Sequence, residues 1–123
     1  MVIRKGEVIM TAYQQILKGI QEMGFGELLV SSHEEANQNT RKRNIVLIPE
    51  DNGSGLCDIY LTYKYQDQLG EFVCWVSDEF DAEPNLVNII LSAVDEFYHY
   101  TDEELDTDLI PNEQLVPGFT LLD

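Results

Sequence analysis

Carboxylates are the side chains most able to do chemistry in this sequence, and five of them have the spacing of a calcium loop. They occupy positions 1, 3, 5, 7 and 12 of a twelve-residue segment, as Asp102, Glu104, Asp106, Asp108 and Glu113. Oxygen ligands at these positions bind Ca²⁺ in helix–loop–helix proteins. Position 6 is Thr107, however, where the sharp turn needs glycine, and position 10 is Pro111. We therefore keep an acidic calcium site as one hypothesis, with solvated carboxylates around Leu105 as its alternative.

The cysteines and histidines lack the neighbours that catalysis requires. Cys57 and Cys74 are expected on adjacent strands, displaced by roughly 20 Å along them, whereas a disulfide joins Cα atoms within about 7 Å. We therefore expect two free, largely buried thiols, as is usual in a reducing cytoplasm. His33 lies in a polar segment, and His99 ends a predicted helix, where its charge suits the helix dipole. No nucleophile or phosphate-binding motif is present, so we expect neither an enzyme nor a cofactor.

Negative charge is concentrated in the second half of the chain. The 123 residues include 23 Asp and Glu against 7 Lys and Arg, a net charge of −16. Residues 1–64 hold all seven basic residues, whereas residues 65–123 hold fifteen acidic residues and no Lys or Arg. The broad basic surface that nucleic-acid binding needs is therefore excluded. No apolar run reaches the roughly 18 residues of a membrane span, so we expect no membrane insertion.

Two helices are predicted from capping signals and apolar periodicity. Thr11 and Gln14 form a capping box ahead of apolar residues at helical spacing. Gly24 suits the left-handed position that ends a helix. The first helix is therefore predicted at 12–23. The second is predicted at 84–99, where proline stands at the first helical position and an amphipathic face follows.

Three strands are predicted between these helices. Residues 45–48 form a β-branched run that a proline ends, and residues 57–65 alternate apolar with polar side chains, as a half-buried strand does. Residues 72–77 return after a turn. Residues 28–30 are too short to classify, and residues 32–35 suit one helical turn. The expected fold is α+β, a three-stranded antiparallel meander with two helices packed on one face, in the order α-β-β-β-α.

The domain organisation follows from the two ends of the chain. Lys5, Gly6 and Glu7 would be encoded by a purine-rich ribosome-binding sequence, and two more codons lead to Met10. We therefore interpret residues 1–9 as a non-native leader and the source as a bacterium. The leader is too short and too polar for a secretory signal, which predicts a location in the cytoplasm of a bacterial host cell. Residues 10–108 are predicted to form a single domain. Residues 109–123 contain two prolines and scattered apolar side chains and are predicted as an extended tail.

Acidic residues interleaved with apolar ones predict a binding surface for a basic partner. Carboxylates at the spacing of phosphates can occupy a cleft lined with Lys and Arg and exclude DNA or RNA from it, with a gain mainly in association rate. Phe80, Trp75, Tyr98 and Tyr100 lie among these acids and are candidate anchors. The alternative is that the charge serves solubility only. The predicted contact set is Asp78, Glu79, Asp81, Glu83, Asp102, Glu103, Glu104, Asp106 and Asp108.

In size, charge and order of elements, residues 11–108 resemble the small acidic inhibitors that phages and mobile elements make against host defence, the anti-CRISPR and anti-restriction DNA mimics. The resemblance lies in architecture and transfers no site residues. It implies a non-enzymatic inhibitor that binds a basic, nucleic-acid-facing surface of a host protein, such as a CRISPR nuclease or a restriction enzyme. Direct binding of nucleic acid is not implied.

Two alternatives stay open. The first is an immunity or antitoxin-type protein that binds its partner through an apolar clamp at residues 109–122. The second is a small domain built around the acidic calcium site. The basic trio at residues 41–43 is interpreted as a solvated edge guard, as a contact for phosphate or an acidic partner, or as a partner for the chain's own acidic half. The oligomeric state does not follow from the sequence.

Overall fold

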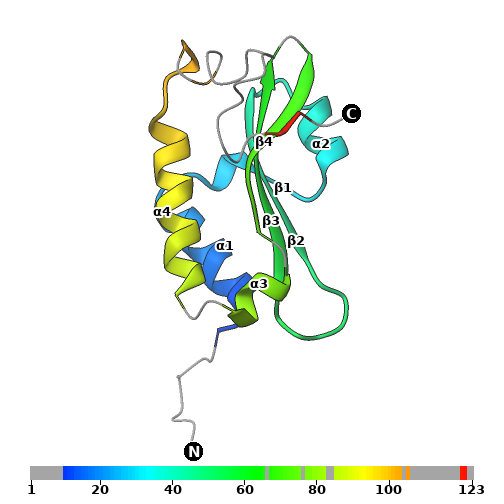
Figure 1. The fold of residues 1–123 in the computed structure, drawn as a ribbon, viewed down its shortest axis with the longest axis vertical. Coiled ribbons are helices and arrows are strands. Elements are labelled where there is room, and N and C mark those ends of the chain that lie inside the picture. The colour runs from blue at the N-terminus through cyan, green and yellow to red at the C-terminus, as the bar shows by residue number, and fades with distance from the viewer. Residues whose placement is uncertain are drawn as a thin grey trace, which may run out of the picture.

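The computed structural model describes residues 10–65, 67–75, 77–82, 85–103, 105 and 120–121, and at residues 65, 72–75 and 120–121 it describes the backbone alone. Figure 1 shows the arrangement. In chain order the elements are α1 (Ala12–Glu22), η1 (Gly26–Leu28), β1 (Leu29–Val30), α2 (His33–Gln38), β2 (Arg43–Pro49), β3 (Cys57–Tyr65), β4 (Gln68–Trp75), α3 (Ser77–Ala82), α4 (Leu86–His99) and β5 (Thr120–Leu121). The predicted leader and most of the predicted tail lie outside the described residues.

The sheet is mixed, so the predicted three-stranded antiparallel meander is wrong. Its order is β1-β2-β3-β4, and the two-residue β5 pairs with β4. Strands β2, β3 and β4 are antiparallel as predicted. Strand β1 adds to the outer side of β2 and runs parallel to it, with Leu29 opposite Ile45 and Val30 opposite Val46. Strand β1 belongs to the segment that was too short to classify, because two residues carry no periodicity.

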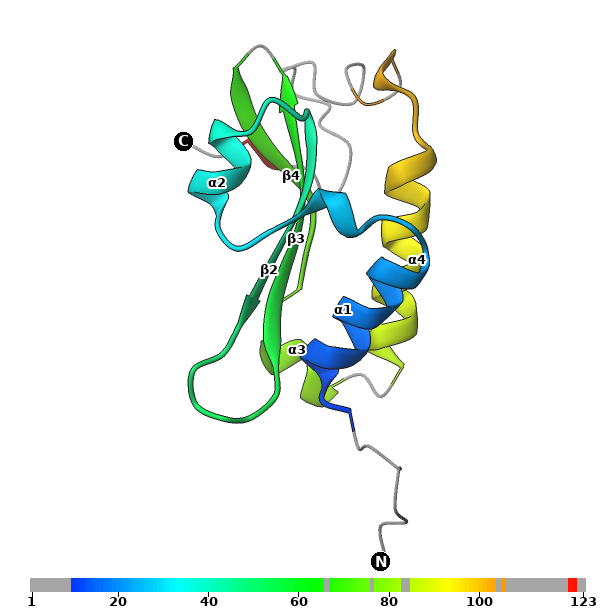
Figure 2. The same cartoon turned by 180° about the vertical axis from the view of Figure 1, so that it is seen from behind.

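The helices cover both faces of the sheet, which also corrects the prediction that they share one face. Helices α1 and α4 lie against one face, and α2 lies on the other, as Figures 1 and 2 show from opposite sides. The larger core contains Ile16 of α1 and Ile90 of α4. A smaller core on the other face contains Ala36 of α2 packed with Val46 of β2. Strand β2 is apolar on both faces for this reason, because it is a central strand that is covered on both sides.

Helix α1 confirms the predicted capping signals. Its N-cap Thr11 accepts from the backbone of Gln14, and the Gln14 side chain accepts from the backbone of Thr11, at 3.1 and 3.0 Å. Gly24 has φ +87° after the last turn. Its N–H donates to Gln21 and the N–H of Phe25 donates to Ile20, the hydrogen bonds of a Schellman motif. Helix α4 ends at His99 as predicted and begins at Leu86, two residues after the predicted start.

The β3–β4 hairpin is tighter than the predicted turn. Tyr65 pairs with Gln68 rather than with a residue near Phe72, and the register shifts between Leu61 and Thr62. Tyr60 therefore lies opposite Cys74, three residues along β3 from Cys57. At the rise of a strand these backbones are still roughly 10 Å apart, beyond the reach of a disulfide. Cys57 is buried and free, as predicted. The Cys74 side chain lies outside the description.

The start of α1 is fixed against the loop between β2 and β3. The N–H of Tyr13 donates to the carbonyl of Gly55 at 3.0 Å. Gly55 has φ +77°, and a Cβ atom there would lie 2.4 Å from Cγ2 of Thr11, so only glycine fits this contact. No described helix is both long enough and apolar enough to span a membrane.

Candidate functional site

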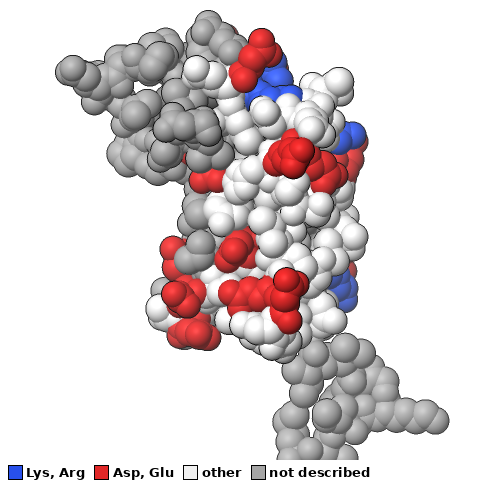
Figure 3. Space-filling model, turned by 90° about the vertical axis from the view of Figure 1, so that its right-hand side faces the viewer, with Lys and Arg blue, Asp and Glu red and all other residues white. Residues whose placement is uncertain are grey.

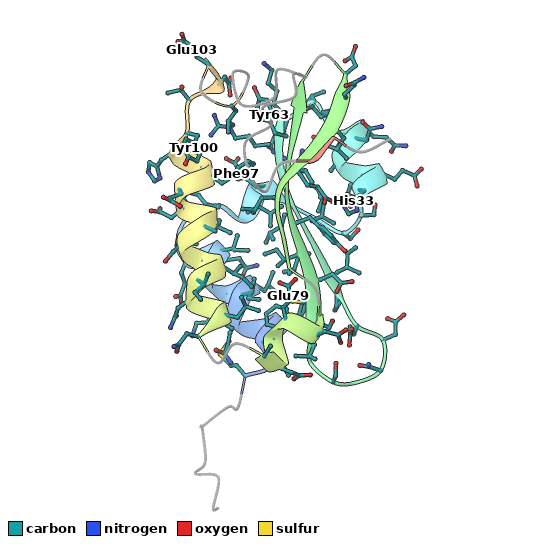
Figure 4. The ribbon with its side chains drawn as sticks, viewed as in Figure 1. His33, Tyr63, Glu79, Phe97, Tyr100 and Glu103 are labelled. Carbon is teal, nitrogen blue, oxygen red and sulfur yellow. The ribbon has the colours of Figure 1, made fainter. Side chains whose placement is uncertain are left out.

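The predicted contact residues lie at opposite ends of α4. Asp78, Glu79 and Asp81 are on α3, which precedes α4, whereas Asp102 and Glu103 follow its end. Helix α4 has 14 residues, a length of about 21 Å. Figure 4 shows Glu79 and Glu103 at opposite ends of the molecule. The predicted set is therefore divided between two places. Its other members lie outside the described residues: Glu83, Glu104, Asp106 and Asp108.

The carboxylates beyond α4 have partners within the chain. Asp102 pairs with Arg43 of β2 at 2.9 Å. The same guanidinium donates to the carbonyls of Phe97 and Tyr98, at 3.2 and 2.7 Å, and so caps the end of α4. Glu103 also has an interaction partner. One member of the basic trio thus pairs with the chain's own acidic half, which was one of the three interpretations of that trio.

A denser group of carboxylates surrounds α3. Helix α3 lies beside the loop that joins β2 to β3 (Figure 1). The backbone N–H of Ser77, the first residue of α3, donates to Oδ1 of Asp58 at 3.3 Å, and the hydroxyl oxygen of Ser77 lies 3.4 Å from the same atom. Figure 3 shows acidic side chains gathered over this lower end of the molecule. We call this group the acidic end, and it comprises Glu50, Asp51, Asp58, Asp78, Glu79 and Asp81.

Glu50 ties the acidic end together. A hydrogen bond from the Ser77 side chain is the main cause that lowers the pKa of Glu50, and bonds from Ser54 and Asn52 add to it while burial acts in the opposite direction. Oε2 of Glu50 accepts from Oγ of Ser54 and from Nδ2 of Asn52, each at 3.1 Å. These hydrogen bonds link the β2–β3 loop to α3 through the Glu50 carboxylate.

Lysine and arginine gather at the other end of the sheet. Arg41, Lys42 and Arg43 stand at the start of β2, and Lys64 stands near the end of the antiparallel β3. Lys64 donates to the backbone carbonyls of Asn37 and Asn39 at the end of α2. Lys42 lies over the ring of Tyr63, 5.9 Å from its centroid. Over the described part of the chain, no carboxylate of the acidic end has a Lys, Arg or His partner within 4.0 Å.

The sequence interpretation missed three members of the acidic end: Glu50, Asp51 and Asp58. Their signal was present, because residues 45–48 and 57–65 were predicted as adjacent strands, and a hairpin brings the residues at its turn together. The prediction favoured the residues after Ser77 instead, because acidic residues follow one another more closely there. The interaction of Ser77 with Asp58 is a contact between strand and helix that spacing alone does not predict.

The histidines contact other residues of the fold, and Cys57 is buried within it. His33 is not a free surface residue, because its Nε2 lies 2.5 Å from Oε1 of Glu71 on β4 and its ring packs edge-on against Tyr60. Nδ1 of His99 lies 2.8 Å from the carbonyl of Asp95, one turn earlier in α4. Burial is the main cause that raises the pKa of Cys57 to about 12, so this thiol is not a nucleophile at neutral pH.

The candidate aromatic anchors do not gather at the acidic end. Tyr98 and Tyr100 are each 40% exposed at the far end of α4, where Tyr98 stacks on Phe25 with centroids 4.1 Å apart. Phe80 of α3 is half-buried and packs against the larger core. The Trp75 side chain lies outside the description. Phe80 is therefore the candidate anchor that lies beside the acidic carboxylates.

The calcium hypothesis falls mostly on residues that the structure does not describe. Residues 104 and 106–113 of the predicted loop belong to this part of the chain. Among the described residues, no three His, Cys, Asp or Glu side chains are placed to share a metal ion. Comparison of the chain with protein-family models, with curated protein sequences and with solved structures found no match.

Proposed function

We propose that this protein is a non-enzymatic inhibitor that binds a basic, nucleic-acid-facing surface of a host protein in the bacterial cytoplasm. The observation that carries the proposal is the acidic end, where α3, the start of β3 and the β2–β3 loop carry six carboxylates that have no cationic partner among the described residues. Solubility alone does not require four of the five described Lys and Arg residues to lie at the opposite end of the strands. A partner with Lys and Arg at its surface supplies the missing counter-charge.

The acidic end suits binding because part of it is ordered before a partner arrives. The backbone N–H of Ser77 donates to Asp58, and the hydrogen bond of the Ser77 side chain to Glu50 joins the β2–β3 loop to α3. Carboxylates that are already positioned lose less conformational entropy on binding. The concentrated charge also attracts a basic partner over a distance and raises the association rate.

The proposed contact set follows from this geometry. It keeps Asp78, Glu79 and Asp81 from the sequence prediction and adds Glu50, Asp51 and Asp58. Asp102 is excluded because Arg43 already neutralises it. The exposed carboxylates on α3 are the best positions for a test, because each can be changed without removing a described hydrogen bond.

The test uses the full chain with an affinity tag at its C-terminus as bait in nuclease-treated bacterial lysate. Bound protein is eluted with duplex DNA at constant ionic strength. We expect DNA to release a basic protein that binds nucleic acid. The triple variant D78K/E79K/D81K should lower retention of that protein by about tenfold or more at low salt, with a smaller difference at high salt.

A matched triple variant separates position from total charge. E27K/E34K/E96K changes the net charge by the same amount at exposed carboxylates outside the acidic end. It should retain the partner nearly as well as the unchanged chain. Equal loss in both triple variants would show that only net charge matters. Retention of no DNA-eluted protein at all would contradict the proposed function.

A further inference from the structure

The loop between β2 and β3 carries an asparagine directly before a glycine, Asn52 and Gly53. Every other asparagine of the chain precedes a residue with a side chain. The amide carbon of an asparagine can be attacked by the peptide nitrogen of the next residue, because both belong to one short stretch of chain. Glycine leaves that nitrogen unhindered because it has no Cβ atom. Asn52 and Gly53 are also both exposed to water, so this dipeptide has the composition of a site that modifies itself.

The backbone nitrogen of Gly53 is free to act as the nucleophile. Its N–H makes no hydrogen bond with any residue in the described part of the chain. Beyond its chain neighbours, nothing lies within 4 Å of the point where a Cβ atom of Gly53 would stand. The N–H groups of helices and strands differ, because backbone carbonyls hold them in hydrogen bonds. Attack by the Gly53 nitrogen therefore breaks no hydrogen bond of the fold.

Two hydrogen bonds keep the side-chain amide of Asn52 close to this nitrogen. Oδ1 of Asn52 accepts from the N–H of Ser54 at 2.9 Å. This is an Asx turn, and its hydrogen-bonded ring contains both Cγ of Asn52 and the nitrogen of Gly53. The Ser54 N–H also polarises the amide carbonyl and would stabilise the negative charge that forms on its oxygen during attack. Nδ2 of Asn52 donates to Oε2 of Glu50 at 3.1 Å, so both ends of the amide are oriented.

We propose that Asn52 and Gly53 form a self-modification site, at which Asn52 is converted to aspartate and isoaspartate through a succinimide ring. The nitrogen of Gly53 loses its proton to hydroxide and bonds to Cγ of Asn52. The bond from Cγ to Nδ2 breaks, and Nδ2 leaves as ammonia with a proton from water. Water then opens the ring at either carbonyl. Cleavage of the bond between Cγ and nitrogen gives aspartate, and cleavage between the backbone carbonyl carbon and nitrogen gives isoaspartate.

The reaction would add a carboxylate to the acidic end. The amide that donates to Glu50 is replaced by a carboxylate, which repels Glu50 instead. Isoaspartate also lengthens the backbone of the loop by a methylene group. The reaction goes beyond the proposed function, because it needs no partner and runs in the free protein. The added charge would strengthen the attraction of the acidic end for a basic partner.

The test follows the purified full chain during incubation at neutral and at mildly alkaline pH. Peptide mapping by mass spectrometry measures the exchange of the amide for a carboxyl group at each asparagine, and chromatography separates the aspartate and isoaspartate products. Asn88 is the internal control, because it is equally exposed but precedes the β-branched Ile89, whose N–H donates to Asn85. We expect Asn52 to react about tenfold or more faster than Asn88. Equal rates at the two asparagines would overturn the proposal.

The dependence on pH tests the attacking group. We expect the reaction at Asn52 to accelerate as the pH rises, because the nitrogen of Gly53 must lose its proton before it attacks. Isoaspartate should appear beside aspartate, because the succinimide opens at both carbonyls. Aspartate alone, or a rate that does not change with pH, would indicate direct hydrolysis by water and would overturn the succinimide route.

A comparison of the folded with the unfolded chain separates the structure from the dipeptide. In urea the hydrogen bonds from Asn52 to Ser54 and Glu50 are lost, whereas glycine still follows asparagine. We expect the folded chain to react at least as fast as the urea-unfolded chain at the same pH and temperature. A folded chain that reacts more slowly would show that the loop holds the amide away from the nitrogen, and would overturn the proposal.

Two substitutions locate the chemistry in this loop. N52Q keeps an amide but lengthens the side chain, so the same attack would need a larger ring, and we expect no product at this position. G53A places a methyl group beside the nitrogen and should slow the reaction about tenfold. Gly53 has φ +75°, a conformation that strains alanine, so circular dichroism checks that G53A folds. If it does not, N52Q decides, and product from N52Q at the rate of the unchanged chain would contradict the proposed site.

Discussion

At the scale of single residues, Arg43 makes the contact that joins the sheet to the end of α4. Its side chain is 17% exposed, and it reaches two carbonyls of α4 and the carboxylate of Asp102. The planar guanidinium suits this arrangement because it presents several donors at once. Asp102 is 58% exposed, so the carbonyl bonds are the larger part of the contribution to stability.

We expect R43A to lower the free energy of unfolding by about 1–3 kcal/mol, because it removes charge-assisted bonds that are mostly shielded from water. D102N should cost less, about 1 kcal/mol at most. Urea unfolding followed by circular dichroism measures both. R41A, at an exposed neighbour, should change stability by about 0.5 kcal/mol or less. Equal effects for R41A and R43A would contradict the capping role.

Cys57 gives the protein a stability limit at alkaline pH. Its pKa is raised from 9.0 to about 12, first by burial and then by the charges of Asp58 and Glu50. The unfolded chain loses this proton at a lower pH than the folded chain does. The contribution is therefore full below about pH 9 and is lost as the pH rises toward 12, at roughly 1.4 kcal/mol per pH unit. Urea unfolding at pH 8 to 11 should show a smaller decrease in C57A than in the unchanged chain, whereas identical slopes would contradict burial of the thiol.

At the scale of elements, sequence signals identified the parts whose information is local. The capping box of Thr11 and the glycine after α1 were readable because both act within a few residues. Strand β1 could not be predicted from local signals, because its two residues form a strand only through their pairing with β2. The uninterrupted apolar residues of β2 were a clue that both of its faces are covered. In a sheet with one face open to water, apolar and polar side chains would alternate along this strand, as they do along part of β3.

A substitution at Val46 tests the two-sided burial of β2. Val46 is fully buried against Ala36 of α2, on the face that the sequence prediction left open to water. V46A should therefore lower the free energy of unfolding by about 1.5–3 kcal/mol, as measured by urea unfolding. I48A, at the partly buried end of the same face, should cost less. A neutral V46A would indicate that α2 does not cover this face.

At the scale of the whole molecule, charge is distributed along the long axis. The acidic end lies at the β2–β3 loop, and four of the five described Lys and Arg residues lie at the opposite end of the same strands. The sequence showed that acidic residues are in excess in the second half of the chain, but it could not show that acidic and basic side chains separate along the long axis of the fold. The axis arises because antiparallel pairing brings Lys64 beside Lys42, whereas the hydrogen bond from Ser77 holds Asp58 beside α3 at the other end.

Salt should act in opposite directions on the free protein and on its complex. With a net charge of −16, the carboxylates repel one another in the folded state. Raising NaCl from about 0.02 to 0.5 M should screen this repulsion and so increase the free energy of unfolding. The same change should weaken partner binding, mainly through slower association. Urea unfolding and association kinetics over one salt series measure both. Stability that falls with salt would show that attraction between the two ends outweighs repulsion.

The contact between Gly55 and Thr11 has a practical consequence for reporting on the site. It holds the first turn of α1 against the loop that carries Glu50 and Asp51, and Figure 1 shows that turn beside α3. A fluorophore attached at Met10 would therefore sit next to the carboxylates and respond when they are covered. A bulky fusion at the same position would stand in the way. A fluorophore that reports on binding is therefore best attached at the N-terminus of this domain, and an affinity tag or fusion partner at its C-terminus.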